Sequence, residues 1–129
     1  MSDDAERIVR DMLAAFGRRD LEAVMAAFAA DAVYHNVPVA PIAGTAGIRE
    51  IFTAFLAAME WLDLEVVHLA ARGPMVLTER VDHFLMRTGA RFDLPVAGVF
   101  EVRDGKIVAF RDYFDLASFE RPSGMRLTA

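Results

Sequence analysis

The amino-acid sequence predicts an α+β fold in which a cone-shaped, curved sheet, antiparallel or mixed, packs on three N-terminal helices. Three observations carry this prediction. Apolar residues recur at helical spacing in the first half of the chain, and from Leu62 onward they alternate with their neighbours as in strands. The pair Asp104-Gly105 between two apolar runs is a strong hairpin signal. Helices followed by a run of adjacent strands are typical of the α+β class.

Three segments with apolar residues three and four positions apart predict the helices. The first covers residues 2–17, and Ser2 can serve as its N-cap. The second covers residues 21–28 and follows a second potential cap, Asp20. The third covers residues 45–59. Each segment has one apolar face, which we expect to lie against the sheet.

The strands are predicted from alternation and from the turns between them. A short extended segment at residues 32–36 and a loop with two prolines at residues 37–44 separate the second and third helices. Four longer strands are expected over residues 62–70, 75–86, 92–103 and 107–114. In the first of these, one face is expected to carry Leu62, Leu64, Val66, His68 and Ala70.

Composition limits the classes of function. The chain of 129 residues is expected to form one domain, residues 1–129, with 55% hydrophobic and 26% charged residues. A net charge of −5 with scattered basic residues disfavours nucleic acid and anionic membrane surfaces as partners. The absence of Cys excludes disulfides, thiolate nucleophiles and Cys metal sites. The apolar runs are too short to span a bilayer and the first residues are acidic, so we expect a cytoplasmic protein.

Charged residues inside apolar strands mark a candidate site. Arg80 and Asp82 are two positions apart, so a strand presents both on one face among apolar neighbours. Asp112 lies between Phe110 and Phe114 in the same way. Buried ions cost several kcal/mol unless they are well paired, so this set is a candidate for function, although each residue taken alone fits a structural role better. The alternative is a pair on the surface, with Asp112 bound to some nearby arginine.

Three motifs connect these residues to a known family. In chain order they are Tyr34-His-Asn36-Val-Pro38, Thr78-Glu-Arg-Val-Asp82 and Arg111-Asp-Tyr-Phe-Asp115. Together they resemble the limonene-1,2-epoxide hydrolase family, whose cone-shaped fold is shared with nuclear transport factor 2 and ketosteroid isomerase. The segments Gly98-Val-Phe100 and Gly105-Lys-Ile107 fit the same pattern, so the resemblance covers about residues 13–119.

The resemblance implies a division of catalytic roles. Asp112, Tyr34 and Asn36 would hold the hydrolytic water, with Asp112 as the general base. Asp82 would be the general acid that protonates the epoxide oxygen, and Arg80 would hold both carboxyl groups. Water would attack directly, without a covalent enzyme ester. Which aspartate carries the proton at rest stays open, because two adjacent carboxyl groups titrate as a coupled pair.

The resemblance also implies an apolar cavity for a small nonpolar epoxide. Its expected lining residues are Leu13, Phe16, Phe55, Met59, Trp61, Phe84, Leu94, Val96 and Phe114. Any single one of them can instead be ordinary core. A terpene, lipid, sterol or aryl epoxide would each suit such a lining.

Further expectations concern partners. The histidines at positions 35, 68 and 83 lack metal-ligand spacing, and the chain contains neither a phosphate loop nor a dinucleotide fingerprint. We therefore expect no metal and no cofactor. The fold implied by the resemblance suggests a homodimer that covers Val81, His83 and Leu85 on the outer sheet face.

Two other functions are compatible with the same fold, since fold does not determine function. One is a ketosteroid-isomerase-like or polyketide-cyclase-like enzyme that moves a proton with a single carboxylate and an oxyanion partner. The other is a non-catalytic binder of small hydrophobic molecules. The presence of all five polar residues favours the hydrolase over both.

Overall fold

The helices and strands follow one another as the sequence predicts, with additions at two points. The computed structural model describes residues 2–127, and the side chain of the expected cap Ser2 lies outside what it describes. The elements are α1 (Ser2–Gly17), α2 (Leu21–Ala26), β1 (Phe28–Asn36), β2 (Ile42–Ala43), α3 (Thr45–Ala58), β3 (Met59–Arg72), β4 (Met75–Met86), β5 (Arg91–Arg103), β6 (Lys106–Tyr113) and α4 (Leu116–Ser123).

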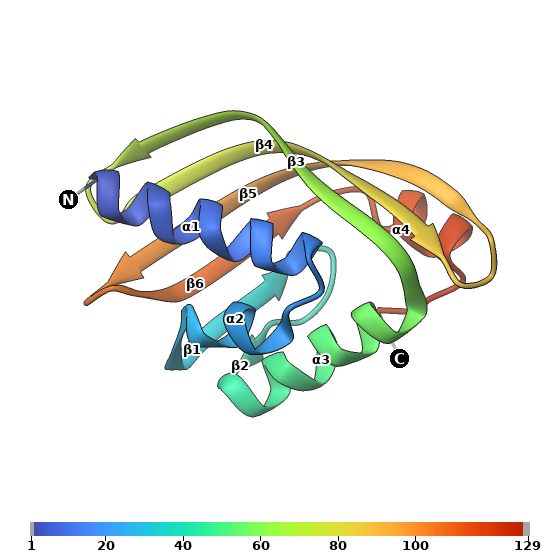
Figure 1. The fold of residues 1–129 in the computed structure, drawn as a ribbon, viewed down its shortest axis with the longest axis horizontal. Helices are drawn as coiled ribbons and strands as arrows, with labels where there is room; N and C mark the ends of the chain where they lie inside the picture. The colour runs from blue at the N-terminus through green and yellow to red at the C-terminus, as the bar shows by residue number, and fades with distance from the viewer. Residues whose placement is uncertain (1, 128–129) are drawn as a thin grey trace.

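The strands form one curved, mixed sheet of six strands in the order β2-β1-β6-β5-β4-β3. β1 and β6 are parallel, and the other neighbours are antiparallel. In Figure 1 the long strands arch over α1, while α2 and α3 lie below it and α4 lies at the end where β4 turns into β5. This confirms the predicted α+β fold with a curved mixed sheet on three N-terminal helices.

A cluster of aromatic rings joins the helices to the sheet. Phe52 of α3 contacts Phe16 of α1 and Tyr34 of β1, with ring centroids 5.0 and 4.9 Å apart. Tyr34 in turn packs on Phe110 of β6 at 5.0 Å. Edge-on and tilted ring pairs of this kind add to the free energy of plain burial. The four elements are therefore held together at one place, next to the cavity described below.

The turns and caps follow from local chemistry. Asp104 and Gly105 both have positive φ, 53° and 76°, as a two-residue hairpin of the primed type requires. Asp20 caps α2 by accepting a hydrogen bond from the Ala23 amide at 3.2 Å. α4 was not predicted, although Asp115 caps it in the same way by accepting from the Ser118 amide at 2.9 Å.

Two expectations at element boundaries were wrong. Phe28 and Met59, expected at the ends of helices, are the first residues of β1 and β3. The expected face of β3 also fails in its second half, because the register shifts between Val66 and His68. After this bulge His68 is exposed, and Leu69 and Ala71 occupy the inward positions.

Among residues 2–127 no helix is both long and apolar enough to cross a membrane. Val81, His83 and Leu85 lie on the outer face of β4, as expected, and are half-buried. That a second copy covers this face stays a prediction.

His83 connects three strands on that outer face. Its Nδ1 lies 2.6 Å from Asp93 Oδ1 of β5, and its Nε2 lies 2.8 Å from Glu65 Oε1 of β3. Hydrogen bonds to Asp93 and Glu65 raise the pKa of His83. The charged imidazole therefore stabilises the fold fully below about pH 6.5, the pKa of an unfolded histidine, and this contribution is lost as the pH rises through the raised pKa.

We predict that His83→Gln lowers the free energy of unfolding more at pH 5.5 than at pH 9, as measured by urea denaturation. The control is His68→Gln, since His68 pairs with Glu79 and its side chain is 80% exposed. Equal losses for His83→Gln at the two pH values would contradict the prediction.

Candidate active site

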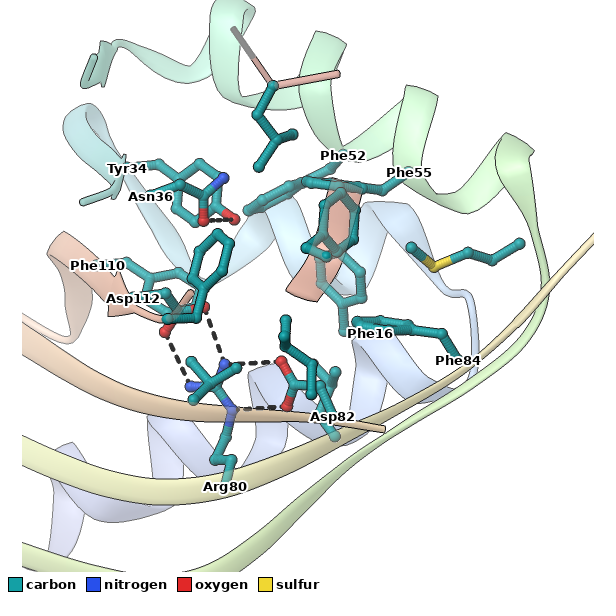
Figure 2. A pocket seen from close by; sticks show the side chains of 17 residues that line it. Phe16, Tyr34, Asn36, Phe52, Phe55, Arg80, Asp82, Phe84, Phe110 and Asp112 are labelled. Carbon is teal, nitrogen blue, oxygen red and sulfur yellow. Dashed lines mark hydrogen bonds and ion pairs between the residues drawn. The ribbon is translucent and has the colours of Figure 1, made fainter. Parts of the chain in front are cut away.

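The five polar residues predicted from the sequence all line one cavity under the concave face of the sheet. The cavity volume is about 60 Å³, and a water molecule needs roughly 10–15 Å³ of such space. The cavity thus has room for a few waters beside the polar groups. Figure 2 shows Arg80 between Asp82 and Asp112, with Tyr34 and Asn36 on the Asp112 side.

Strand periodicity and strand pairing position these side chains. Arg80 and Asp82 occupy inward positions two apart on β4. Asp112 occupies an inward position on β6, and its neighbour in the parallel β1–β6 pair is Asn36. Tyr34 is two residues before Asn36 and points to the same side. Three strands of one sheet, β1, β6 and β4, therefore deliver all five groups to the cavity.

Every N–H donor of the Arg80 guanidinium has an acceptor. Nε and Nη2 donate to the two oxygens of Asp82 at 3.0 and 3.1 Å. Nη1 and Nη2 donate to the two oxygens of Asp112 at 3.0 and 2.9 Å. The remaining Nη1 proton points to Thr78 Oγ1 at 3.3 Å. Arg80 is 1% exposed, so these contacts replace its entire hydration shell.

Burial and charge act against each other in this ion cluster. Burial by itself would lower the pKa of Arg80, but the charges of Asp112 and Asp82 outweigh it, so the pKa is raised and the guanidinium stays charged. Burial raises the pKa of Asp112, Arg80 opposes this rise, and the charge of Asp82 adds to it. Asp112 is therefore a stronger base than an ordinary aspartate.

Tyr34 and Asn36 form a second polar group in the cavity. Tyr34 Oη donates a hydrogen bond to Asn36 Oδ1 at 2.9 Å. Burial raises the pKa of the Tyr34 hydroxyl well above its ordinary value, so the hydroxyl keeps its proton. The Asn36 NH₂ group and the Tyr34 oxygen lone pairs remain as a donor and an acceptor for a small polar molecule.

Most of the expected apolar lining is found in the cavity wall. Seven of the nine residues line it, namely Phe16, Phe55, Met59, Phe84, Leu94, Val96 and Phe114. Leu13 and Trp61 do not, which corrects the expectation for both. Leu13 is buried where α1 meets β3, and Trp61 is 42% exposed on the outer face, 5.4 Å from the Arg91 guanidinium. The register shift between Met59 and Trp61 turns Trp61 outward.

Five apolar residues of the wall were not predicted from the sequence. These are Phe52, Leu64, Phe110, Phe119 and Leu127. Periodicity could have found the first three, since Phe52 is three positions before Phe55 and Phe110 is two before Asp112. Phe119 and Leu127 could not be assigned to the wall because α4 was not predicted.

Histidines contribute to no metal site in the part of the chain that the structure describes, where no group of three or more His, Cys, Asp or Glu side chains could hold a metal ion. His35 Nε2 lies 2.8 Å from the Val39 carbonyl oxygen. His68 and His83 pair with carboxylates on the outer face.

Comparison with known proteins places this site in context. The family model of the limonene-1,2-epoxide hydrolase catalytic domain matches residues 3–121. The epoxide hydrolase EphG of Mycobacterium tuberculosis is 34% identical over 108 residues, which are 84% of this chain and 71% of EphG. The structure of an M. tuberculosis epoxide hydrolase of the limonene type superposes with a TM-score of 0.83 at 32% identity, covering 94% of this chain and 90% of that one.

The same fold occurs in other proteins. A putative polyketide cyclase from Xanthomonas campestris pv. campestris superposes with a TM-score of 0.86 at 23% identity, covering 95% of this chain and 98% of that one. At this identity the likeness concerns the fold alone.

We predict that Arg80→Leu lowers the free energy of unfolding by about 3–5 kcal/mol at pH 7, because two buried carboxyl groups lose their cation. Without Arg80 the folded-state pKa of a buried carboxyl lies above its unfolded value. The loss therefore shrinks as the pH falls and both states become protonated.

Urea denaturation at pH 7 and pH 4 measures this difference. The matched control is Arg111→Leu, since Arg111 pairs with Glu101 at 2.7 Å where both side chains are about one-third exposed. That pair is worth at most about 1 kcal/mol. A similar loss for the two variants at pH 7 would contradict the buried-bridge interpretation.

Proposed function

The chain belongs to the limonene-1,2-epoxide hydrolase family, and from this premise we propose that it hydrolyses a nonpolar epoxide to a vicinal diol by direct attack of an activated water. The observation that carries the proposal is the single guanidinium that holds two carboxyl groups inside an apolar cavity. Such a set can remove a proton at one carboxyl group and supply one at the other.

Asp112 is the proposed general base. It is the carboxyl group next to Asn36 in the sheet, and Tyr34 and Asn36 offer one acceptor and one donor at that side of the cavity. A water there can donate a proton to Asp112 and accept a hydrogen bond from Asn36. One lone pair is then free to attack an epoxide carbon. The raised pKa of Asp112 favours proton transfer from the water.

Asp82 is the proposed general acid. An epoxide opens readily only if its oxygen receives a proton while the carbon is attacked, because an alkoxide is a poor leaving group. Asp82 protonates the oxygen as the C–O bond breaks, and the water oxygen forms the new C–O bond. At the end Asp112 holds the proton taken from the water and Asp82 is ionised. Transfer of one proton between the two carboxyl groups, directly or through solvent, restores the starting state.

Arg80 balances the charge throughout this cycle. One cation with two ionised carboxyl groups would leave a net charge of −1 in an apolar environment, which is costly. One shared proton makes the cluster neutral, and the same count holds before and after the reaction. Arg80 therefore contacts both carboxyl groups in either state and keeps their separation constant.

The substrate proposed is small and nonpolar, because aromatic and aliphatic side chains form the rest of the wall. Polyketide-cyclase-like or isomerase-like chemistry uses one carboxylate and would leave Asp82 or Asp112 without a function. A non-catalytic binder would not need either of them. The hydrolase uses every polar group in the cavity.

We predict that one or more members of a panel of terpene, alkyl, sterol and aryl epoxides give a diol. In single-turnover reactions in oxygen-18 water with enzyme in excess, mass spectrometry should find one labelled oxygen in the first diol formed. An unlabelled first diol would indicate a carboxylate ester instead, and no diol from any epoxide would disprove the hydrolase proposal.

We also predict that Asp82→Asn and Asp112→Asn each lower kcat by about 10²–10⁴-fold, because an amide can neither donate the acidic proton nor accept one from water. Steady-state kinetics on the best epoxide of the panel, with circular dichroism to verify folding, measures this. Asp63→Asn, on the exposed face of β3, is the control. Near-normal turnover by either buried-site variant would rule out its assigned role.

A further inference from the structure

We propose that Gly98 is a positioning residue of this site: its missing side chain leaves the passage through which Arg80 of β4 reaches across β5 to bind Asp112 of β6. Backbone pairing holds β4, β5 and β6 in register, whereas the passage exists only because residue 98 is a glycine. The steric role of Gly98 does not depend on the proposed function, whereas its consequence for turnover rests on that function.

Strand register places Gly98 in the middle of the ion cluster. On β5, Gly98 is paired with Thr78 of β4 on one side and with Asp112 of β6 on the other. Adjacent strands are about 4.8 Å apart, so β4 and β6 are separated by roughly twice this distance. Arg80 spans it, because Nη1 and Nη2 lie 3.0 and 2.9 Å from the Asp112 oxygens. The guanidinium must therefore pass over the inward face of β5.

A side chain at position 98 would collide with the bridge itself. A Cβ built on Gly98 would lie 2.5 Å from Arg80 Nη1, 2.7 Å from Thr78 Oγ1 and 2.9 Å from Asp112 Oδ1. Carbon atoms do not approach such groups so closely without displacing them. All three atoms belong to the hydrogen bonds that hold the guanidinium. Alanine, the smallest alternative, already displaces at least one of them.

Space, rather than backbone conformation, is the reason for this glycine. Gly105 has a φ of 76°, which other residues rarely adopt, but Gly98 is not among the residues with positive φ. A glycine inside a regular strand costs stability, since it loses more conformational freedom on folding and packs no side chain. At position 98 this cost is offset by the buried ion bridge that the glycine permits.

The first test is a double-mutant cycle that needs no substrate. Gly98→Ala should lower the melting temperature of the wild type by roughly 4–12 °C through overpacking. In an Arg80→Leu background the guanidinium is gone and Thr78 and Asp112 can turn aside, so the loss should fall to less than half that value. A loss of half or more of the wild-type value would overturn the proposal.

The second test measures turnover of the best epoxide from the panel. Gly98→Ala should lower kcat by roughly 10²-fold, as expected for a misplaced catalytic group, with a much smaller change in KM. Weaker contact with Arg80 raises the pKa of Asp112 further, so the acidic limb of the pH–rate profile should move to higher pH. A general loss of stability would leave that limb in place, and an unmoved limb would overturn the catalytic part of the proposal.

Ala97→Val is the matched control, because Ala97 is the adjacent residue on the exposed outer face of the same strand. It should change neither kcat nor the acidic limb, and if it reproduces the Gly98→Ala profile the proposal is wrong. If the wild type opens no epoxide, the proposed function fails while the melting-temperature cycle still decides the role of Gly98.

Discussion

Removing a guanidinium from water is one of the most expensive steps in folding, and in this protein the side chain that undergoes it is Arg80. The cost is tolerated only if every N–H finds a partner, and here the partners come from β4 itself and from β6, on the far side of β5. The backbone ladders hold β4, β5 and β6 in register, and the bridge adds a side-chain connection between β4 and β6 on the inward face. The two buried carboxyl groups and the glycine at position 98 are the partners and the space that this connection uses.

The polar cavity and the hydrophobic core are continuous in this fold. Tyr34 packs its ring on Phe52 and Phe110, while its hydroxyl binds Asn36. The Phe110 ring also lies 5.9 Å from the Arg80 guanidinium. Few polar atoms compete with the ion cluster, so its hydrogen bonds act in a medium of low polarity and are stronger than they would be in water. The same environment raises the pKa of Asp112.

The same fold occurs in an epoxide hydrolase of the limonene type and in a putative polyketide cyclase. The sheet supplies inward-facing positions at regular spacing, and the residues that occupy them determine the chemistry. In this chain two acids, one cation and one glycine occupy neighbouring inward positions on three adjacent strands. A substitution at any of these positions would change the polar groups that the cavity presents.

Local sequence patterns alone determined which residues share a strand face and where one of the hairpins lies. The alternation in residues 75–86 put Arg80 and Asp82 on one face, the same rule placed Asp112 between phenylalanines, and Asp104-Gly105 predicted its hairpin. Periodicity could not show which strands pair with one another. That β1 lies parallel to β6, which brings Asn36 beside Asp112, is decided by contacts between residues far apart in the chain. The family motifs suggested this neighbourhood, but periodicity did not.

The tertiary structure also decided where regular alternation fails. Two bulges in β3 turn Trp61 and His68 outward, because an extra residue in one strand reverses the faces of those after it. Of the wall residues that were not predicted, Phe119 lies in α4 and Leu127 lies after it, and Phe119 packs on rings of α3, β4 and β5 that are distant in the sequence. The periodicity of side chains is set within one segment, whereas strand pairing, bulges and the curvature of the sheet depend on contacts across the whole chain. The sequence alone could therefore identify charged residues on apolar strand faces, and the family motifs suggested that Arg80 holds both acids. Only the folded sheet shows that these ions are buried and that Arg80 reaches Asp112 over Gly98.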